Sequence, residues 1–319
     1  MSDVNSAGIY LARELEQKLP KLYEKKYPQY WAAEGMFHKS SATLERGAAS
    51  VTEQIIEGRG EALPLSDYNT DFPTNQVAIN ETSFKVIDFV TRINYTILEL
   101  WAAEKAGKDI VSLRLNQAYK TMQERIHRHA VFGNARYNHQ GLFSSTLVTN
   151  TVSSYDPNAS TWQDDLDFFR FAMSDLADSV NNTAQTGYIL IPPRLRFKLA
   201  STYQTGDSGA TVLAALMDNF GVNNGGFLKG IIGANECRAA ELEREGVNAP
   251  GSNLDRIMFI PDTEDYAERL YYPVFQTAPE LKDLQYQVIL VQGTSEVIFH
   301  LPREARYYSF TTLSLAPAP

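Results

Sequence analysis

Hydrophobic positions between residues 109 and 132 recur every three or four residues, as on one face of an α-helix. The positions in this stripe are Val111, Leu115, Ala118, Tyr119, Met122, Ile126 and Ala130. Asp109 precedes the stripe as a natural N-cap, and Gly133 follows it where a C-cap glycine is favoured. The pattern predicts one long helix of roughly 35 Å. A shorter helix is expected before it, over Tyr95–Ala106.

Residues 51–96 show no helical stripe. Their two β-prone flanks, Val51–Ile56 and Val77–Thr91, are separated by glycine, proline, asparagine and aspartate residues. This pattern predicts a long, irregular β-hairpin with its tip near Tyr68–Asn75. Loops of this length are uncommon in compact domains. We therefore expect the hairpin to lie against a neighbouring molecule.

Strands and helices alternate in the central part of the chain. Ser160 and Gln163 have capping-box spacing and begin a helix whose apolar seam comprises Trp162, Leu166, Phe169, Met173, Leu176 and Val180. The segments predicted after it are a strand over 186–192, helices over 193–201 and 209–220, and strands over 228–233 and 255–261.

The C-terminal part is rich in β-forming residues. Segments 284–292 and 295–302 flank Gly293 and Thr294, which predicts a hairpin with a two-residue turn. A final strand is expected around Tyr307–Leu313. Together with the helices, these segments predict an α+β fold.

The charge balance bears on the class of partner. The chain of 319 residues has 29 Lys and Arg against 38 Asp and Glu, a net charge of −9, which argues against general nucleic-acid binding through phosphate neutralisation. Its single cysteine, Cys237, excludes an internal disulfide and a cysteine-rich zinc site. The first ten residues lack the features of a secretory signal, and no apolar run approaches the ~20 residues of a membrane helix. We expect a soluble protein made inside the cell.

Residues 1–40 are expected to form an arm packed against something else. Apolar residues at helical spacing predict an amphipathic helix that ends at Pro20. The lysines that follow, within KLYEKKYPQYW, could touch a polyanion or simply form a solvated face.

Candidate chemistry is sparse. The motifs G-x-S-x-G, H-E-x-x-H and G-x-G-x-x-G are all absent from the sequence. His127 and His129 project roughly 200° apart on a helix, so we do not expect them to share a metal ion with each other and His139. An acidic cluster comprises Asp164, Asp165, Asp167, Asp175 and Asp178. Its first two members suit the first turn of a helix, and the others are expected on the polar side. Cys237 has no dependable base for a nucleophilic role, so we expect no catalytic, cofactor-binding or metal-ligating residues and no cofactor.

Three stretches of sequence resemble one protein family. RINYTILELWAAEKAG resembles a hairpin exit, RHAVFGNARYNHQGLFSS the end of a strut helix with its Gly-Leu turn, and TGYILIPPRLRFKLAS the strand, proline and helix that enter a central domain. With the order of elements along the chain, they resemble the major capsid proteins of tailed bacteriophages. These have the Hong Kong 97-type fold, which encapsulin shells share.

The resemblance implies a domain organisation. It comprises an N-terminal arm over residues 1–50, an extended hairpin loop over 51–95, a peripheral domain over 96–155 and 286–319 with a spine helix at about 109–132, and an axial domain over 156–285. Leu63, Leu65 and Phe72 near the hairpin tip would be exposed in a lone chain and buried against a neighbouring subunit in a shell.

The resemblance also implies a function. The chain would self-assemble through hexamers and pentamers into an icosahedral phage head around double-stranded DNA, without sequence-specific DNA binding and without a membrane. Scaffold, portal and decoration proteins are implied further partners. The protein would be made in the host bacterial cytoplasm and end in the virion capsid. Two alternatives stay open: an encapsulin-like compartment, and a soluble enzyme that uses the carboxylates of Asp164 to Asp178.

Overall fold

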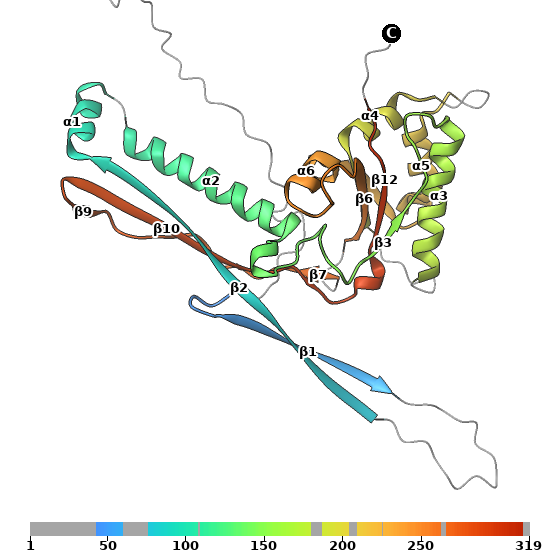
Figure 1. The fold of residues 1–319 in the computed structure, drawn as a ribbon, viewed down its shortest axis with the longest axis horizontal. Coiled ribbons are helices and arrows are strands. Elements are labelled where there is room, and N and C mark those ends of the chain that lie inside the picture. Colours follow the sequence, from blue (N-terminus) through green and yellow to red (C-terminus); the bar gives the residue numbers. More distant parts are fainter. Residues whose placement is uncertain are drawn as a thin grey trace, which may run out of the picture.

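The computed structural model of this chain describes residues 43–59, 76–107, 109–179, 187–203, 209–224, 226–262 and 266–314. A long hairpin and a long helix extend from a more compact body, which holds a second large sheet and most of the helices (Figure 1). The predicted N-terminal helix, the lysine-rich stretch and the tip of the hairpin lie outside the described residues.

Strands β1 (Ser50–Arg59) and β2 (Gln76–Thr96) form the predicted hairpin. Their antiparallel register runs from Ser50 opposite Lys85 to Arg59 opposite Gln76. The remaining half of β2 pairs with β10 (Gln285–Ser295). One continuous strand therefore serves both the projecting ribbon and a sheet of the body.

Helices α1 (Ile97–Lys105) and α2 (Ile110–Phe132) follow β2. The start predicted at Tyr95 is two residues early, because Tyr95 still pairs in β2 and Thr96 caps α1. The Asp109 side chain accepts a hydrogen bond from the backbone N–H of Ser112 (3.0 Å), and Gly133 ends α2 at a φ of 72°. Both ends of the long helix are thus as predicted.

The apolar stripe of α2 packs on β2 and β10. The buried residues of this contact are Ile93, Tyr95, Ala118, Met122, Ile126, Val288 and Leu290. Short strands β8 (Phe275–Gln276) and β9 (Glu280–Lys282) add to β10, giving the order β1-β2-β10-β8 with β9 also on β10. The helix and this sheet together form the elongated part of the molecule (Figure 1).

A second sheet organises the body, in the order β3-β12-β6-β4-β5. Its strands are β3 (Thr149–Val152), β4 (Gly187–Ile191), β5 (Leu228–Gly233), β6 (Leu254–Pro261) and β12 (Arg306–Thr311). The C-terminal part of the chain contributes to both sheets, because β10 pairs with β2 and β12 pairs with β6.

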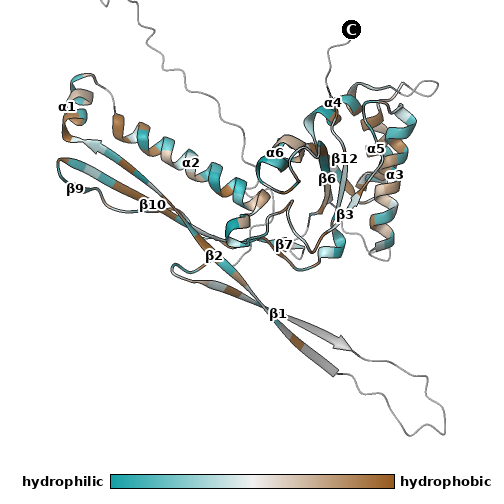
Figure 2. Ribbon diagram, in the orientation of Figure 1, coloured by the Kyte–Doolittle hydropathy of each residue, from teal (hydrophilic) through white to brown (hydrophobic). Residues whose placement is uncertain are grey.

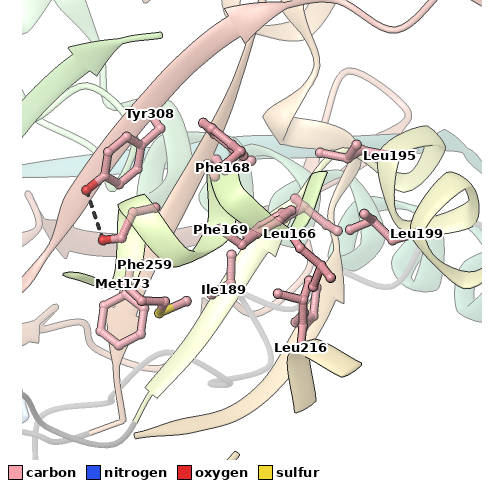
Figure 3. Close-up of a cluster of buried hydrophobic side chains, with 14 of the residues drawn as sticks. Leu166, Phe168, Phe169, Met173, Ile189, Leu195, Leu199, Leu216, Phe259 and Tyr308 are labelled. Carbon is pink, nitrogen blue, oxygen red and sulfur yellow. Dashed lines mark hydrogen bonds between the residues drawn. The ribbon is translucent and has the colours of Figure 1, made fainter. Parts of the chain in front are cut away.

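Helices cover both faces of this body sheet. On one face, α3 (Trp162–Ser179), α4 (Pro193–Ser201) and α5 (Val212–Phe220) bury Leu166 and Phe169, among others, against Ile189 of β4 (Figure 3). The other face packs against α6 (Ala239–Arg244), the end of α2 and the segment after it. Short 3₁₀ turns are η2 (Ala135–Tyr137), η3 (Val222–Asn224), η4 (Asn235–Cys237) and η5 (Pro302–Glu304).

The hairpin predicted at Gly293 and Thr294 is wrong. Both residues lie inside β10, opposite Asp88 and Ile87 of β2. The segment after them forms β11 (Ile298–Phe299), which pairs with β7 (Ala267–Glu268) instead. A Cβ at position 293 would lie 2.3 Å from both Asp88 and the Tyr272 ring. This glycine therefore leaves room for the side chains of Asp88 and Tyr272 and does not mark a turn.

Candidate functional site

The β1–β2 hairpin extends from the body as a ribbon whose outer edges have no strand partner among the described residues (Figure 1). Among the strands that the structure describes, β1 pairs only with β2, and β2 up to Lys85 pairs only with β1. Unpaired strand edges expose backbone N–H and C=O groups that another chain can use. Ile79 on this ribbon is 61% exposed. The ribbon is therefore a candidate surface for contact with another molecule.

Apolar side chains anchor the root of the hairpin to the body. Val51, Phe84 and Val86 pack against a buried cluster formed by Leu44, Leu270, Tyr272 and Ile298. Tyr272 also donates a hydrogen bond to Asp88 of β2 (2.9 Å). Burial and the Asp88 carboxylate raise the pKa of Tyr272 to about 12, so this phenol remains a donor at neutral pH. The root is fixed, and only the part beyond it projects.

His300 adds a polar contact at the same root. Its ring contacts Glu53 of β1 through Nδ1 and lies 3.5 Å from Oε1 of Glu268 in β7 through Nε2. Its two carboxylate neighbours come from remote parts of the chain, and no local pattern signals them.

The predicted contact residues Leu63, Leu65 and Phe72 lie in the segment 60–75, outside the described residues. Their expected burial against a neighbouring subunit therefore stays a prediction. The described strands do lead into that segment from both sides, because Arg59 and Gln76 are paired at the end of the ribbon.

A second apolar surface lies at the far end of α2 from the body. Leu98 and Trp101 of α1 are exposed there, as are Leu281 and Leu284 beside β10. An open groove of about 410 Å³ runs between α1 and the start of α2, lined by Leu100, Trp101 and Val111 among others. Figure 2 shows hydrophobic residues at this end of the helix as well as along β2 and β10. The signal missed in the sequence is the apolar run ILELW, which leaves α1 with no fully polar face.

An ion pair holds α1 in place at this end. Arg114 of α2 donates to Glu99 of α1 (2.9 Å) and to the Asn94 carbonyl (2.6 Å). The Glu99 carboxylate also accepts from the backbone N–H of Thr96, completing the capping box. The hydrogen bond from Arg114, with the one from Thr96, lowers the pKa of Glu99. Helix α1, which presents the exposed apolar side chains, is therefore held in a fixed position relative to α2.

The three histidines of the sequence analysis do not form a site. His127 contacts Glu236 (2.7 Å). The rings of His129 and His139 are buried, with centroids 5.4 Å apart. The His129 ring also packs edge-on against Phe89 of β2. Burial, with smaller contributions from neighbouring cations, lowers the pKa of His129 to about 3. Across the described ranges, no three His, Cys, Asp or Glu side chains are arranged to hold a metal ion.

The acidic cluster of α3 diverges into separate structural contacts. Asp165 is fully buried and accepts hydrogen bonds from Tyr155 (2.6 Å), Ser160 (2.6 Å) and Lys198 (2.9 Å). Asp165 lies in the first turn of α3, as predicted. The sequence did not indicate that it also forms a buried ion pair with Lys198 of α4. Asp164 instead accepts from Thr161 at the helix start.

The other acidic residues of α3 also have structural surroundings. Asp167 lies at the surface near Arg170, Asp175 accepts from Tyr308 (2.7 Å), and Asp178 is exposed. Cys237 is fully buried, and burial raises the pKa of its thiol.

None of the described helices is both long and apolar enough to cross a membrane.

Comparisons with known proteins agree with this architecture. Residues 60–309 match the family model described as major capsid protein, and a search of curated proteins finds no match. The structure is similar to the capsid of Myoviridae phage XM1, with a TM-score of 0.76 and 15% identity over 95% of this chain and 99% of that one. For Gordonia phage Cozz the TM-score is 0.61 at 10% identity, over 98% and 96%. For a virus-like particle from Pyrococcus furiosus it is 0.50 at 13% identity, over 88% and 95%.

These similarities confirm the α+β, Hong Kong 97-type fold expected from the sequence. The family match covers well over half of the chain. A shell-forming role agrees with the unpaired edges of the β1–β2 ribbon and with the exposed apolar side chains of α1, among the described residues. The chain therefore belongs to the major capsid protein family and is a shell-forming structural protein of a bacteriophage.

Proposed function

We propose that this chain assembles as hexamers and pentamers into an icosahedral phage head that encloses double-stranded DNA. The observation that carries the proposal is the ribbon of β1 and β2, which projects from the body with both edges unpaired among the described residues. A lattice of identical subunits offers each ribbon the same neighbouring surface, so one contact is repeated around a closed shell. The protein would be made in the host bacterial cytoplasm and reside in the virion capsid.

We propose the domain roles expected from the sequence: an arm over 1–50, an extended loop over 51–95, a peripheral domain over 96–155 and 286–319, and an axial domain over 156–285. The packing of α2 on β2 and β10 supports a peripheral unit. Strands β3 and β12, from the two peripheral segments, pair with each other, and β12 also pairs with β6 of the axial segment. The exposed Phe171, Phe197 and Tyr203 on or after the helices of that part are suited to contacts with neighbouring axial domains.

The hairpin tip is the proposed intersubunit contact. Leu63, Leu65 and Phe72 would be buried against the next subunit, each contributing roughly 1.5–3 kcal/mol when fully buried. Every subunit would give one hairpin and receive another. A modest contact is thereby multiplied over the shell.

Replacement of residues 60–75 by a short Gly/Ser linker tests this role. We expect unchanged circular dichroism and cooperative melting but no stable shells by electron microscopy, because the four apolar clusters of the described chain lie elsewhere. A control variant replaces residues 181–186 with the same linker chemistry and should still assemble. An unfolded tip variant, or shells of normal stability, would show that the hairpin assignment is wrong.

DNA is the proposed content of the shell. The net charge of −9 suits containment without a tight phosphate grip. Particles from infected cells should contain nuclease-protected DNA, whereas an encapsulin-like compartment should contain cargo protein. Scaffold, portal and decoration proteins would be the further partners.

We also propose that the chain has no catalytic activity of its own. The carboxylates of α3 are engaged separately, with Asp165 in an ion pair with Lys198 and Asp175 accepting from Tyr308. Among the described residues, these carboxylates do not face one another across a common site. This arrangement argues against the alternative of an enzyme that uses the carboxylates of α3. Purified shells should therefore show no hydrolase activity on ester, glycoside or phosphate substrates.

A further inference from the structure

A pocket of about 520 Å³ lies between the end of α2, the segment after it, the turn after α6 and the body sheet. Part of its wall is apolar and includes Phe132, Val148 and Val247. The polar part includes Asn150 of β3 and Arg256 of β6. Pockets of about 300–1,000 Å³ with apolar walls and a few polar groups are typical of small-molecule sites.

The Arg256 guanidinium is held in this wall by groups from three parts of the chain. Nη1 donates to the Phe143 carbonyl (2.5 Å), Nη2 to Oδ1 of Asn248 (2.9 Å) and Nε to the Ser309 hydroxyl (3.4 Å). The guanidinium carbon also lies 5.2 Å from the centre of the Tyr307 ring. A guanidinium carries five N–H groups, so two remain for a ligand on a side chain that is already fixed in place.

No carboxylate balances this buried charge within the described ranges. Arg256 is only 7% exposed, yet its hydrogen-bond acceptors are a carbonyl, an amide and a hydroxyl. The carboxylate of the adjacent Asp255 accepts instead from the backbone N–H of Ala239 (2.8 Å) and from the Thr312 hydroxyl (2.9 Å). Burial lowers the pKa of Arg256. Buried charges in proteins are normally paired with an opposite charge, and here that place is open.

The other ionisable groups around the pocket compensate one another. Glu245, which also lines it, contacts both Arg128 and Arg244, and Arg244 contacts Glu241 as well. His139 lines the pocket too, and burial lowers the pKa of its ring, so the ring is neutral at neutral pH. The pocket therefore offers one uncompensated positive charge, which matches an anion with a single negative charge.

Asn150 supplies a second donor. Its Oδ1 accepts a hydrogen bond from the Ser309 hydroxyl (3.0 Å), which leaves its NH₂ group to donate, and the residue is exposed. Ser309 is thus shared by Asn150 and Arg256, so both donors belong to one network. A carboxylate has two acceptor oxygens and can accept from a guanidinium and an amide at once.

We propose that this pocket binds a small organic monocarboxylate. Its carboxylate accepts hydrogen bonds from Arg256 and Asn150, and its apolar part packs against Val148 and Val247. The planar guanidinium is suited to a planar carboxylate. The site lies within one chain and does not depend on the proposed function.

Saturation-transfer NMR of sodium butyrate with the full-length chain tests the site. Butyrate is titrated at neutral pH and constant ionic strength, and n-butanol serves as the uncharged probe of similar shape. Arg256→Met removes the charge, and circular dichroism records whether this variant folds. Asn150→Asp, at an exposed position, keeps the test valid if it does not, because the new carboxylate competes for Arg256 and repels the ligand. Asn223→Asp, the same change at an exposed position of η3 outside the pocket, is the matched control.

The proposal expects saturable binding of butyrate and much weaker binding of n-butanol. Arg256→Met and Asn150→Asp should each weaken butyrate binding by at least about tenfold, the loss expected for a charge-assisted hydrogen bond, whereas Asn223→Asp should bind normally. Absence of saturable binding, equal binding of n-butanol, or unchanged binding by Asn150→Asp would overturn the site. Stronger displacement of butyrate by inorganic phosphate than by acetate would overturn the assignment to a carboxylate. Assembled shells should bind butyrate as dissociated subunits do, and loss of binding on assembly would give the pocket to a carboxylate of another chain and overturn the small-molecule assignment.

Discussion

Replacement of Asp165 by asparagine should destabilise the chain far more than the same change at Asp167, two residues away. The Asp165 carboxylate is fully buried and accepts three hydrogen bonds from Tyr155, Ser160 and Lys198 at 2.6–2.9 Å. Asparagine leaves the Lys198 ammonium, only 19% exposed, without its counter-charge. The side chain of Asp167, in contrast, is 73% exposed and lies 3.4 Å from Arg170.

The expected magnitudes follow from these surroundings. Removing one partner of a buried ion pair costs about 3–5 kcal/mol. We expect the lower end, about 3 kcal/mol, because the second oxygen of Asp165 is buried without a hydrogen-bond partner and its desolvation penalty is removed with the charge. Asp167→Asn should change the free energy of unfolding by less than about 0.5 kcal/mol.

Urea unfolding of dissociated subunits provides the assay. Trp162 begins α3 and packs against the same core, so tryptophan fluorescence reports on this region. A double-mutant cycle with Lys198→Met isolates the pair, and the double variant should be less destabilised than the sum of the two single variants. If Asp165→Asn and Asp167→Asn lose equal stability, or if the cycle is additive, the buried ion pair does not have the role described.

Three further outcomes are expected. Burial lowers the pKa of His129 to about 3, whereas a histidine in the unfolded chain has a pKa of ~6.5. The stability that comes from burying the neutral ring is therefore complete above about pH 6.5 and is lost as the pH falls from about 6.5 toward 3. His129→Phe should reduce this loss of stability at acid pH, as measured by urea unfolding. Gly293→Ala places a Cβ 2.3 Å from the Tyr272 ring and should lower the free energy of unfolding by about 1–3 kcal/mol. At Gly230 the nearest atom to an added Cβ is 3.5 Å away, so Gly230→Ala should melt at the normal temperature in calorimetry. Equal melting temperatures for the two variants would contradict the close contact at Gly293. Cys237, fully buried with a raised thiol pKa, should react with a thiol reagent only after denaturation, and a rapid reaction of the native chain would refute its burial.

Local patterns were sufficient for the long helix and much of the central region. The stripe from Val111 to Ala130, the cap at Asp109 and the glycine at 133 all lie within one element, and each acts through neighbours a few residues away. The apolar runs of β4, β5 and β6 were likewise visible, because strands buried on both faces need few polar positions.

Contacts between distant segments could not be predicted in the same way. Gly293 and Thr294 have the chemistry of a turn, and only the approach of Tyr272 and β2 explains why they lie inside a strand. Asp165 looks like an ordinary helix-start carboxylate until Lys198 is placed beside it. The contacts of His300 are with Glu53 of β1 and Glu268 of β7, and these residues share no spacing that a sequence pattern could reveal.

The pairing of β2 with β10 also has a consequence for synthesis of the protein. β2 ends at Thr96 and its partner begins at Gln285, so residues 97–284 must be made before the strand can be completed. Pairings this remote form late, since loop-closure entropy opposes them until the rest of the fold is in place. On the ribosome, the local pairing of β1 with residues 76–85 can therefore precede the pairing of residues 86–96 with β10. A chain that ends before Gln285 lacks the strand that pairs with residues 86–96 of β2, so its hairpin is not joined to a complete sheet.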